Sequence, residues 1–238
     1  MWENINLKFK KYIIYLVSFV MVLSCFVAPI GNCSIKVKAH AKKYTDLCID
    51  SNVKVLFIGD SRTVDMFSAT RHEIKGEVYN NITVYARDGA TMGFMKETLK
   101  KVNLDEYDIV VSWMGANEHG HFDKYPSYYK KLMEKKNVKL VLCTIGYSDD
   151  GKLGDLGDCL YYNNGIMLNY NRMLTKWAKK NHVKTIDLYS YTKHHIKARK
   201  NNGVHYDHRQ KEDLWNYTVK QIVKKVNTMK EHHKLASC

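Results

Sequence analysis

Proline is scarce in this sequence, with only Pro29 and Pro126 among 238 residues. Low-complexity runs and internal repeats are absent as well, which argues against disordered and repeat architectures. The contents of hydrophobic residues (45%) and charged residues (26%) are those of an ordinary globular protein. A chain of this length can bury one sizeable core, so we expect a single folded domain.

Cysteines spaced as zinc ligands are also missing. Four of the six cysteines lie beyond residue 41, and their spacing matches no zinc pattern. Cys143 stands inside the apolar run Val138–Ile145, which predicts a buried, inert thiol. Cys48 and Cys159 flank loops and could form a disulfide in an oxidising compartment.

The first forty residues differ in kind from the rest of the chain. A lysine cluster at residues 8–11 precedes the uncharged apolar stretch 13–30, and Ala39-His40-Ala41 then offers small residues at the spacing of a signal-peptidase site. The order is that of a secretory signal, although eighteen apolar residues can also just span a bilayer as an uncleaved anchor. We therefore expect a protein that is secreted, or anchored in the membrane with its domain outside the cytoplasm.

This leader divides the chain into residues 1–41 (signal peptide or N-terminal membrane anchor), 42–52 (linker) and 53–238 (folded domain). Without residues 1–41, 33 basic and 23 acidic side chains remain, a net charge of +10. For an exported protein, a basic surface suits an anionic cell-wall polymer or a membrane surface. We expect no nucleic-acid partner, because the lysines are scattered and no arginine-rich arm or nucleic-acid-binding motif is present.

Apolar strands alternate with amphipathic helices along the folded domain. The predicted strands are Val53–Ile58, Ile82–Ala86, Asp108–Met114, Val138–Ile145 and Val183–Leu188. The predicted helices are Met92–Val102, Tyr125–Lys136, Asn164–Asn181 and Gln210–His233. This rhythm predicts an α/β fold, a three-layer α/β/α sandwich around a flavodoxin-like, doubly wound parallel sheet of about five strands.

One segment, Gly146–Gly165, breaks the rhythm with glycines, aspartates and tyrosines and no clear periodicity. Loops of this length are usually functional or disordered. Because it follows the fourth predicted strand, we expect it to fold over the rim of the sheet as a lid that shapes substrate selection.

A serine follows the first predicted strand directly. In Val55–Arg62 four apolar residues lead into Gly59, Asp60 and Ser61, so a tight turn would lift the Ser61 hydroxyl onto the rim of the sheet. Ligands of open α/β sheets bind at this rim. Taken alone, however, Ser61 is better explained as a helix-capping residue.

Three further signals follow later strands. Gly89 comes after the second strand, Asn117 after the third, and His205 between the fifth strand and the last helix. Acyl transfer needs a hydroxyl nucleophile, an imidazole base and hydrogen-bond donors for the oxyanion. Ser61 and His205 supply the first two, and the Ser61 N–H, the Gly89 N–H and the Asn117 amide are suitable donors.

Taken together, Gly59-Asp60-Ser61, Gly89, Gly115-x-Asn117 and Gly203-Val204-His205 resemble the four sequence blocks of the SGNH (GDSL-type) hydrolases. The resemblance covers the chain from about Val53 to the final helix. It implies a three-layer α/β/α esterase or acylhydrolase that needs no metal or other cofactor.

Carried over to this sequence, the resemblance implies Ser61 as the catalytic nucleophile and His205 as its base. The oxyanion hole would consist of the Ser61 N–H, the Gly89 N–H and the Asn117 side chain. Gly93 competes for the second block, but Gly89 fits better because Gly93 is expected inside a helix.

In this family an Asp usually stands three residues before the histidine. This sequence departs from the pattern, because the residue at that position is Asn202. Asn202 can accept a hydrogen bond from the imidazole but carries no charge. Three alternatives stay open: a backbone carbonyl orients His205, Asp207 does so from the other side, or catalysis is slow or lost.

We therefore expect an exported serine ester hydrolase that removes O-acyl or O-acetyl groups from a cell-wall or extracellular polysaccharide, or cleaves a small ester. An O-acyltransferase that uses the same site is one alternative. A non-catalytic glycan- or cell-wall-binding protein with the same fold is the other, and Asn202 is the residue that favours it.

Overall fold

The computed structural model describes residues 49, 52–136 and 138–236. These residues belong to one compact unit, Leu47–Cys238. The predicted leader at 1–41 lies outside the described residues, as do most of the predicted linker and Cys48. None of the helices within the described ranges is both long and apolar enough to cross a bilayer.

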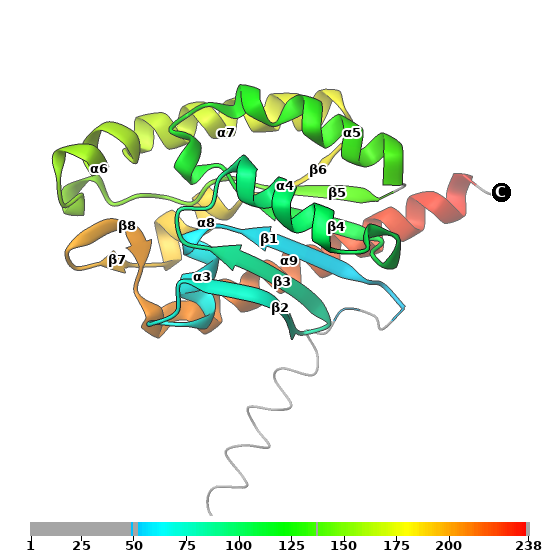
Figure 1. The fold of residues 1–238 in the computed structure, drawn as a ribbon, viewed down its shortest axis with the longest axis horizontal. Helices are drawn as coiled ribbons and strands as arrows, with labels where there is room; N and C mark the ends of the chain where they lie inside the picture. Colours follow the sequence, from blue (N-terminus) through cyan, green and yellow to red (C-terminus); the bar gives the residue numbers. More distant parts are fainter. Residues whose placement is uncertain (1–48, 50–51, 137, 237–238) are drawn as a thin grey trace, which may run out of the picture. The chain divides into compact units, whose positions relative to one another are not determined.

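A six-stranded sheet forms the middle layer (Figure 1). Its strands, in the order in which they lie side by side, are β2 (Glu73–Tyr79), β3 (Ile82–Arg87), β1 (Val55–Gly59), β4 (Ile109–Trp113), β5 (Lys139–Cys143) and β6 (Lys184–Ile186). Five of them run parallel, which confirms the predicted parallel sheet, while β2 pairs antiparallel with β3.

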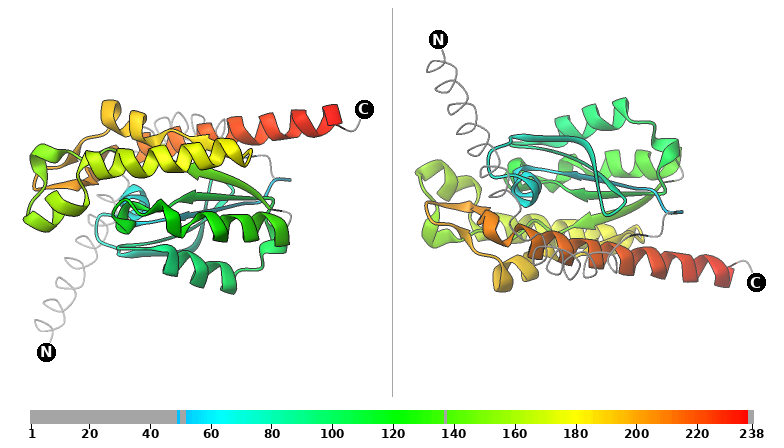
Figure 2. Two further views of the ribbon diagram at one scale, coloured as in Figure 1. Left: turned by 90° about the horizontal axis from the view of Figure 1, so that it is seen from above. Right: turned by 90° about the horizontal axis from the view of Figure 1, so that it is seen from below.

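Helices cover both faces of the sheet (Figures 1 and 2). They are α3 (Ser61–Phe67), α4 (Met92–Lys101), α5 (Pro126–Lys136), α6 (Leu156–Tyr161), α7 (Asn164–Lys180), α8 (Leu188–His195) and α9 (Lys211–Ala236). Val55 and Phe57 of β1 pack into one core with residues of α3, α8 and α9, and Leu56 and Ile58 pack into the other with residues of α4, α5 and α7. The three-layer prediction is therefore confirmed.

The edge strand β2 was not predicted from the sequence. It joins β3 through a two-residue turn in which Asn80 and Asn81 both have positive φ angles, 52° and 63°. This is the backbone conformation of the tight turns that match the twist of a hairpin, and Asn tolerates it better than most residues.

A small hairpin outside the main sheet carries the predicted base. Strands β7 (Ala198–Arg199) and β8 (Asn202–Tyr206) form it, and His205 lies on β8, between the last strand of the main sheet and the last helix as expected from the sequence. The predicted lid at 146–165 holds a short 3₁₀ helix and α6, and Figures 1 and 2 show α6 beside this hairpin at one end of the sheet. The Asp149 N–H donates to the Gly203 carbonyl at 2.9 Å, which ties the segment to the hairpin.

The close packing of α3 on β1 requires glycine at residue 59. A Cβ atom built on Gly59 would lie 1.8 Å from Thr63 Oγ1 and 2.6 Å from Thr63 Cβ, and Thr63 is fully buried. Gly93 is a matched contrast, because the heavy atom nearest to its built Cβ, Thr91 Oγ1, is at an ordinary 3.5 Å.

We expect Gly59→Ala to lower the free energy of unfolding by about 1–3 kcal/mol, the usual cost of forcing extra atoms into a packed core. Gly93→Ala should raise it by about 0.5–1 kcal/mol, because alanine favours the helix. Urea denaturation followed by tryptophan fluorescence measures both values. Equal stabilities for the two variants would contradict this account of Gly59.

Candidate active site

Ser61 is the first residue of α3, directly after the turn that follows β1. The residue that caps this helix is Asp60, whose Oδ1 accepts a hydrogen bond from the Arg62 N–H at 3.0 Å. The alternative that Ser61 is the capping residue is therefore wrong, and its hydroxyl is left for another role. Burial raises the pKa of the Asp60 carboxyl, although the nearby Arg62 guanidinium acts in the opposite direction.

Gly89 lies in the turn after β3 with a φ of +65°, and no atom lies within 4 Å of a Cβ built on it. Within the described ranges, the N–H groups of Gly89 and Ser61 have no hydrogen-bond acceptor. The N–H of the rival Gly93 is instead engaged by Thr91 Oγ1 at 3.3 Å, at the start of α4. Gly89 is thus the better placed donor.

Asn117 lies in a short 3₁₀ helix, Ala116–Glu118, after β4. Its Nδ2 donates to the Ala90 carbonyl at 3.0 Å, and its Oδ1 accepts from the Tyr162 hydroxyl at 3.0 Å. Burial raises the pKa of Tyr162, which keeps this hydroxyl protonated and able to donate. An amide nitrogen has two N–H groups, so the second one is available to an oxyanion.

His205 is held by a carboxylate that the sequence did not single out. Its Nδ1 lies 2.8 Å from Asp65 Oδ2, which also accepts from the Tyr206 N–H at 3.2 Å. Asp65 belongs to α3, one turn after Ser61, and only 6% of its side chain is exposed. The other carboxylate oxygen of Asp65 accepts a hydrogen bond from Arg199.

The structure assigns different partners to the two residues expected to orient the imidazole. Asn202 Oδ1 accepts from the backbone N–H groups of Val204 (3.0 Å) and His205 (3.1 Å), so its carbonyl oxygen shapes the hairpin. Asp207 binds the Arg209 side chain, with its Oδ1 3.0 Å from Arg209 Nε. The suggestion that a backbone carbonyl, Asn202 or Asp207 orients the ring is corrected accordingly: the partner of His205 Nδ1 is the Asp65 carboxylate.

A cavity of about 190 Å³ brings the predicted residues together. Its lining consists of Ser61, Asp88, Gly89, Asn117, Asp158, Tyr162, Asn202, Val204 and His205. All four residues predicted for the nucleophile, the base and the oxyanion hole, which are Ser61, His205, Gly89 and Asn117, are in this set. No hydrogen bond joins the Ser61 hydroxyl to the His205 ring in the described structure, and such contacts often tighten only when substrate binds.

Among known proteins, solved structures resemble this chain in fold. No family model and no curated protein matches the chain. A lipase/acylhydrolase from Enterococcus faecalis superposes with a TM-score of 0.53 at 18% identity, over 73% of this chain and 96% of its own. A protein of Agrobacterium tumefaciens provisionally described as an arylesterase reaches 0.55 at 14% identity, over 74% and 99% of the two chains. A protein of Bacteroides fragilis, provisionally described as an acylhydrolase, superposes with a TM-score of 0.52 at 16% identity, over 84% of this chain and 99% of its own.

The chain shares the fold of these solved structures. Ser61, Gly89 and Asn117 follow β1, β3 and β4. The sequence blocks of the predicted resemblance therefore lie in loops after successive parallel strands, and these loops line one cavity. The predicted resemblance is confirmed at the level of the fold.

Sequence reasoning missed three residues that support the candidate site. Asp65 contacts His205, Tyr162 fixes the amide of Asn117, and Glu118 accepts from the Met92 N–H at 2.7 Å, which links the Asn117 turn to the start of α4. Only Asp65 carried a usable signal, since it stands four residues after the serine and would share its helix face.

A buried arginine joins the segments that form the candidate site. Arg62, 1% exposed, donates from Nε to the Val204 carbonyl (3.0 Å), from Nη1 to the Gly146 carbonyl (3.0 Å) and from Nη2 to Ser148 Oγ (2.8 Å). Its guanidinium also lies 5.6 Å from the centre of the Tyr206 ring. Helix α3, the loop after β5 and the hairpin are thereby fixed to one another.

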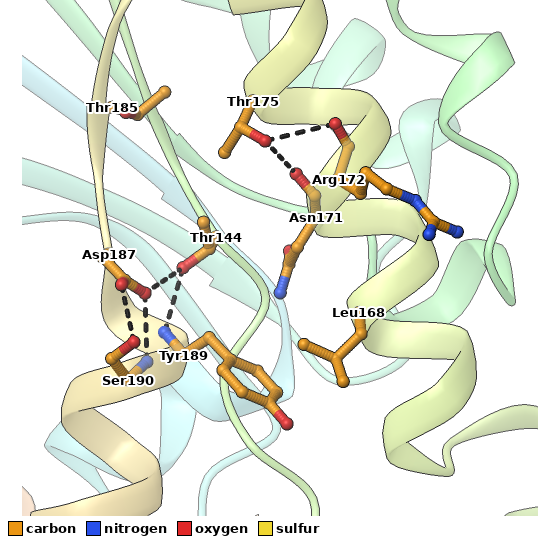
Figure 3. Close-up of a pocket in the computed structure, with 9 residues that line it drawn as sticks. All are labelled: Thr144, Leu168, Asn171, Arg172, Thr175, Thr185, Asp187, Tyr189 and Ser190. Carbon is orange, nitrogen blue, oxygen red and sulfur yellow. Dashed lines mark hydrogen bonds between the residues drawn. The ribbon is translucent and has the colours of Figure 1, made fainter.

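A second, larger cavity of about 520 Å³ lies where β5 and β6 end, between α7 and α8 (Figure 3). Its carboxylate, Asp187, already accepts from the Ser190 N–H and hydroxyl and from Thr144 Oγ1, while Asn171 is bound to the backbone of Ile145. None of the predicted site residues lines it. Across the described residues, no three His, Cys, Asp or Glu side chains gather as a metal site.

The cysteine predictions are partly tested. Cys143 is fully buried, as expected, and burial raises the pKa of its thiol. Cys159 is an exposed free thiol on α6, and its suggested partner Cys48 lies outside the described residues.

We expect Arg62→Met to lower the free energy of unfolding by about 3 kcal/mol or more, because two carbonyls and a hydroxyl lose their buried donor. Arg172→Met is the control, since Arg172 is exposed and its guanidinium donates to Asn169, on the same helix. That variant should change stability by less than about 0.5 kcal/mol. Urea denaturation measures the free energy of unfolding of both variants. A loss of stability in Arg172→Met but not in Arg62→Met would contradict the role assigned to Arg62.

Proposed function

We propose that this protein is a serine ester hydrolase that works through an acyl-enzyme on Ser61. The observation that carries the proposal is the single cavity lined by Ser61, Gly89, Asn117 and His205. A nucleophile, an imidazole and oxyanion donors are the groups that acyl transfer requires. The likeness to solved acylhydrolase structures supports the fold on which this arrangement stands.

The two ring nitrogens of His205 have different roles. Nδ1 faces the Asp65 carboxylate, so Nε2 is the nitrogen left to accept the proton of the Ser61 hydroxyl. As Oγ bonds to the ester carbon, the carbonyl oxygen becomes an oxyanion that the N–H groups of Ser61, Gly89 and Asn117 stabilise. The imidazolium then gives its proton to the departing alcohol oxygen.

Deacylation repeats the same steps with water. His205 Nε2 takes a proton from a water molecule, whose oxygen attacks the acyl carbon of the Ser61 ester. Collapse of the second oxyanion breaks the bond to Oγ, and the serine regains its proton from His205. The products are a carboxylic acid and an alcohol.

The cavity favours a short acyl group on a polar alcohol. Its volume of about 190 Å³ is below the roughly 300–1,000 Å³ of sites for drug-sized ligands. Asp88 and Asp158 in its lining can accept hydrogen bonds from hydroxyl groups, and carboxylates do not suit a hydrocarbon chain. These features support an O-acetylated polysaccharide or a small acetyl ester as substrate.

The place of action that we propose is outside the cytoplasm, either secreted or anchored in the membrane. The leader pattern at 1–41 supports it, together with the net charge of +10 of the remaining chain. A basic surface is attracted to anionic cell-wall polymers and to membrane surfaces.

Ser61→Ala is expected to abolish hydrolysis of p-nitrophenyl acetate and labelling by a fluorophosphonate probe. Asn117→Ala should lower kcat about 10²- to 10³-fold, the usual loss of one oxyanion donor, while labelling of Ser61 is slowed. Steady-state kinetics and mass spectrometry of the labelled protein are the measurements.

Ser190→Ala is the matched control, because this hydroxyl lies in the other cavity. It should leave kcat within about twofold of the unmodified protein. A well-folded natural protein that neither turns over the ester nor reacts with the probe would instead favour a glycan-binding protein without catalysis.

We further expect kcat/KM to fall at least about 10-fold from p-nitrophenyl acetate to p-nitrophenyl octanoate, because each methylene that cannot be accommodated costs binding energy. The comparison is made with both esters below their aggregation concentrations. A preference for octanoate would contradict the short-acyl assignment and leave the hydrolase assignment intact.

A further inference from the structure

The acid that SGNH hydrolases usually carry three residues before the histidine is absent, because residue 202 is Asn. A carboxylate from a different element takes its place beside the imidazole. We propose that Asp65 is the positioning residue of His205, so that Ser61, His205 and Asp65 form a triad whose acid comes from the helix of the nucleophile. The inference rests on the proposed hydrolase function and specifies how its base is prepared.

The geometry of α3 makes this arrangement possible. Ser61 and Asp65 are four residues apart in one helix, so their side chains project from the same face about one turn apart. The ring of His205 lies against this face, with Nδ1 2.8 Å from Asp65 Oδ2, and His205 is one of the residues that line the Ser61 cavity. One element thus sets the distance between the nucleophile and the acid.

The electrostatics favour a positioning role over an exposed ion pair. The side chain of Asp65 is 6% exposed and that of His205 is 24% exposed, so water screens their interaction only weakly. The carboxylate holds the proton on Nδ1, which leaves the Nε2 lone pair for the Ser61 proton. It then stabilises the imidazolium that forms, which a neutral Asn side chain cannot do.

Other contacts fix the carboxylate itself. Arg199 donates to the second oxygen of Asp65, and the Tyr206 N–H donates to the oxygen that faces the imidazole. The backbone carbonyl of Asp65 is 2.9 Å from His208 Nδ1. Asp65 therefore also anchors the hairpin to α3, and an experiment has to separate this structural role from the effect on His205.

Asn202 has a different task. Its Oδ1 holds the backbone N–H groups of Val204 and His205, in the turn that presents the imidazole. The two functions that a single Asp could combine are divided here between Asn202, which shapes the turn, and Asp65, which supplies the charge.

The test is Asp65→Asn in the full chain, which keeps the shape of the side chain and removes its charge. On p-nitrophenyl acetate we expect kcat to fall about 10³- to 10⁴-fold, with KM within about threefold of its original value. The labelling of Ser61 by the fluorophosphonate probe should slow in parallel. Circular dichroism and urea denaturation verify that the variant is folded.

Two variants separate positioning from anchoring. Arg199→Met removes the ion pair of the hairpin but leaves the Asp65–His205 contact, so it should keep more than a tenth of kcat. Asp207→Asn removes the carboxylate that the sequence offered as an alternative partner of His205 but that binds Arg209, and it should leave kcat unchanged. If Arg199→Met loses as much as Asp65→Asn, or if Asp65→Asn keeps a tenth of kcat, the proposal is overturned.

A measurement on the unmodified protein covers the case in which Asp65→Asn does not fold. Nitrogen NMR of ¹⁵N-histidine-labelled protein should show His205 as the tautomer with the proton on Nδ1. The tautomer protonated on Nε2 would refute the role of Asp65. Absence of both turnover and probe labelling in the unmodified protein would instead remove the hydrolase function, so the two failures are distinguishable.

Discussion

The geometry of the site depends on the hydrogen bonds that the buried guanidinium of Arg62 donates. Arg62 follows Ser61 directly and reaches Val204, Gly146 and Ser148, which belong to two segments far away in the sequence. Removing such a charge from water costs several kcal/mol unless each of its donors finds an acceptor. Because this set of acceptors exists only when the hairpin and the loop after β5 are both in place, folding α3 onto the sheet also specifies where His205 must lie.

Much of the fold could be predicted from the sequence because the parallel strands are buried on both faces. Such strands appear as continuous apolar runs, and Val55–Gly59 and Ile109–Trp113 are examples. The edge strand Glu73–Tyr79 has polar residues and a glycine in its middle, so it looks like a loop, and the Asn80–Asn81 turn was its only signal. The β7–β8 hairpin is too short for periodicity to show, and its position depends on contacts with distant segments.

The site was predictable to the extent that it is built from loops after strands. Ser61, Gly89 and Asn117 each follow a parallel strand, and topology brings such positions to one rim. His205 was recognised from its motif, although it lies on a strand of the separate hairpin. The contact with Asp65 joins residues 140 positions apart, and no local pattern shows which helix face a distant hairpin will cover. For this reason the partner of the imidazole emerged only from the three-dimensional contacts.

The short helix α3 has a mechanical consequence. Since Ser61 and Asp65 are carried by the same helix, the separation of their backbone positions is fixed for as long as this helical turn is intact. The imidazole is carried by a hairpin that, among the residues described, forms a two-stranded sheet separate from the main one. The alignment of the imidazole with Ser61 therefore depends on the contacts of Arg62 and Asp65 with the hairpin, rather than on the rigidity of the sheet.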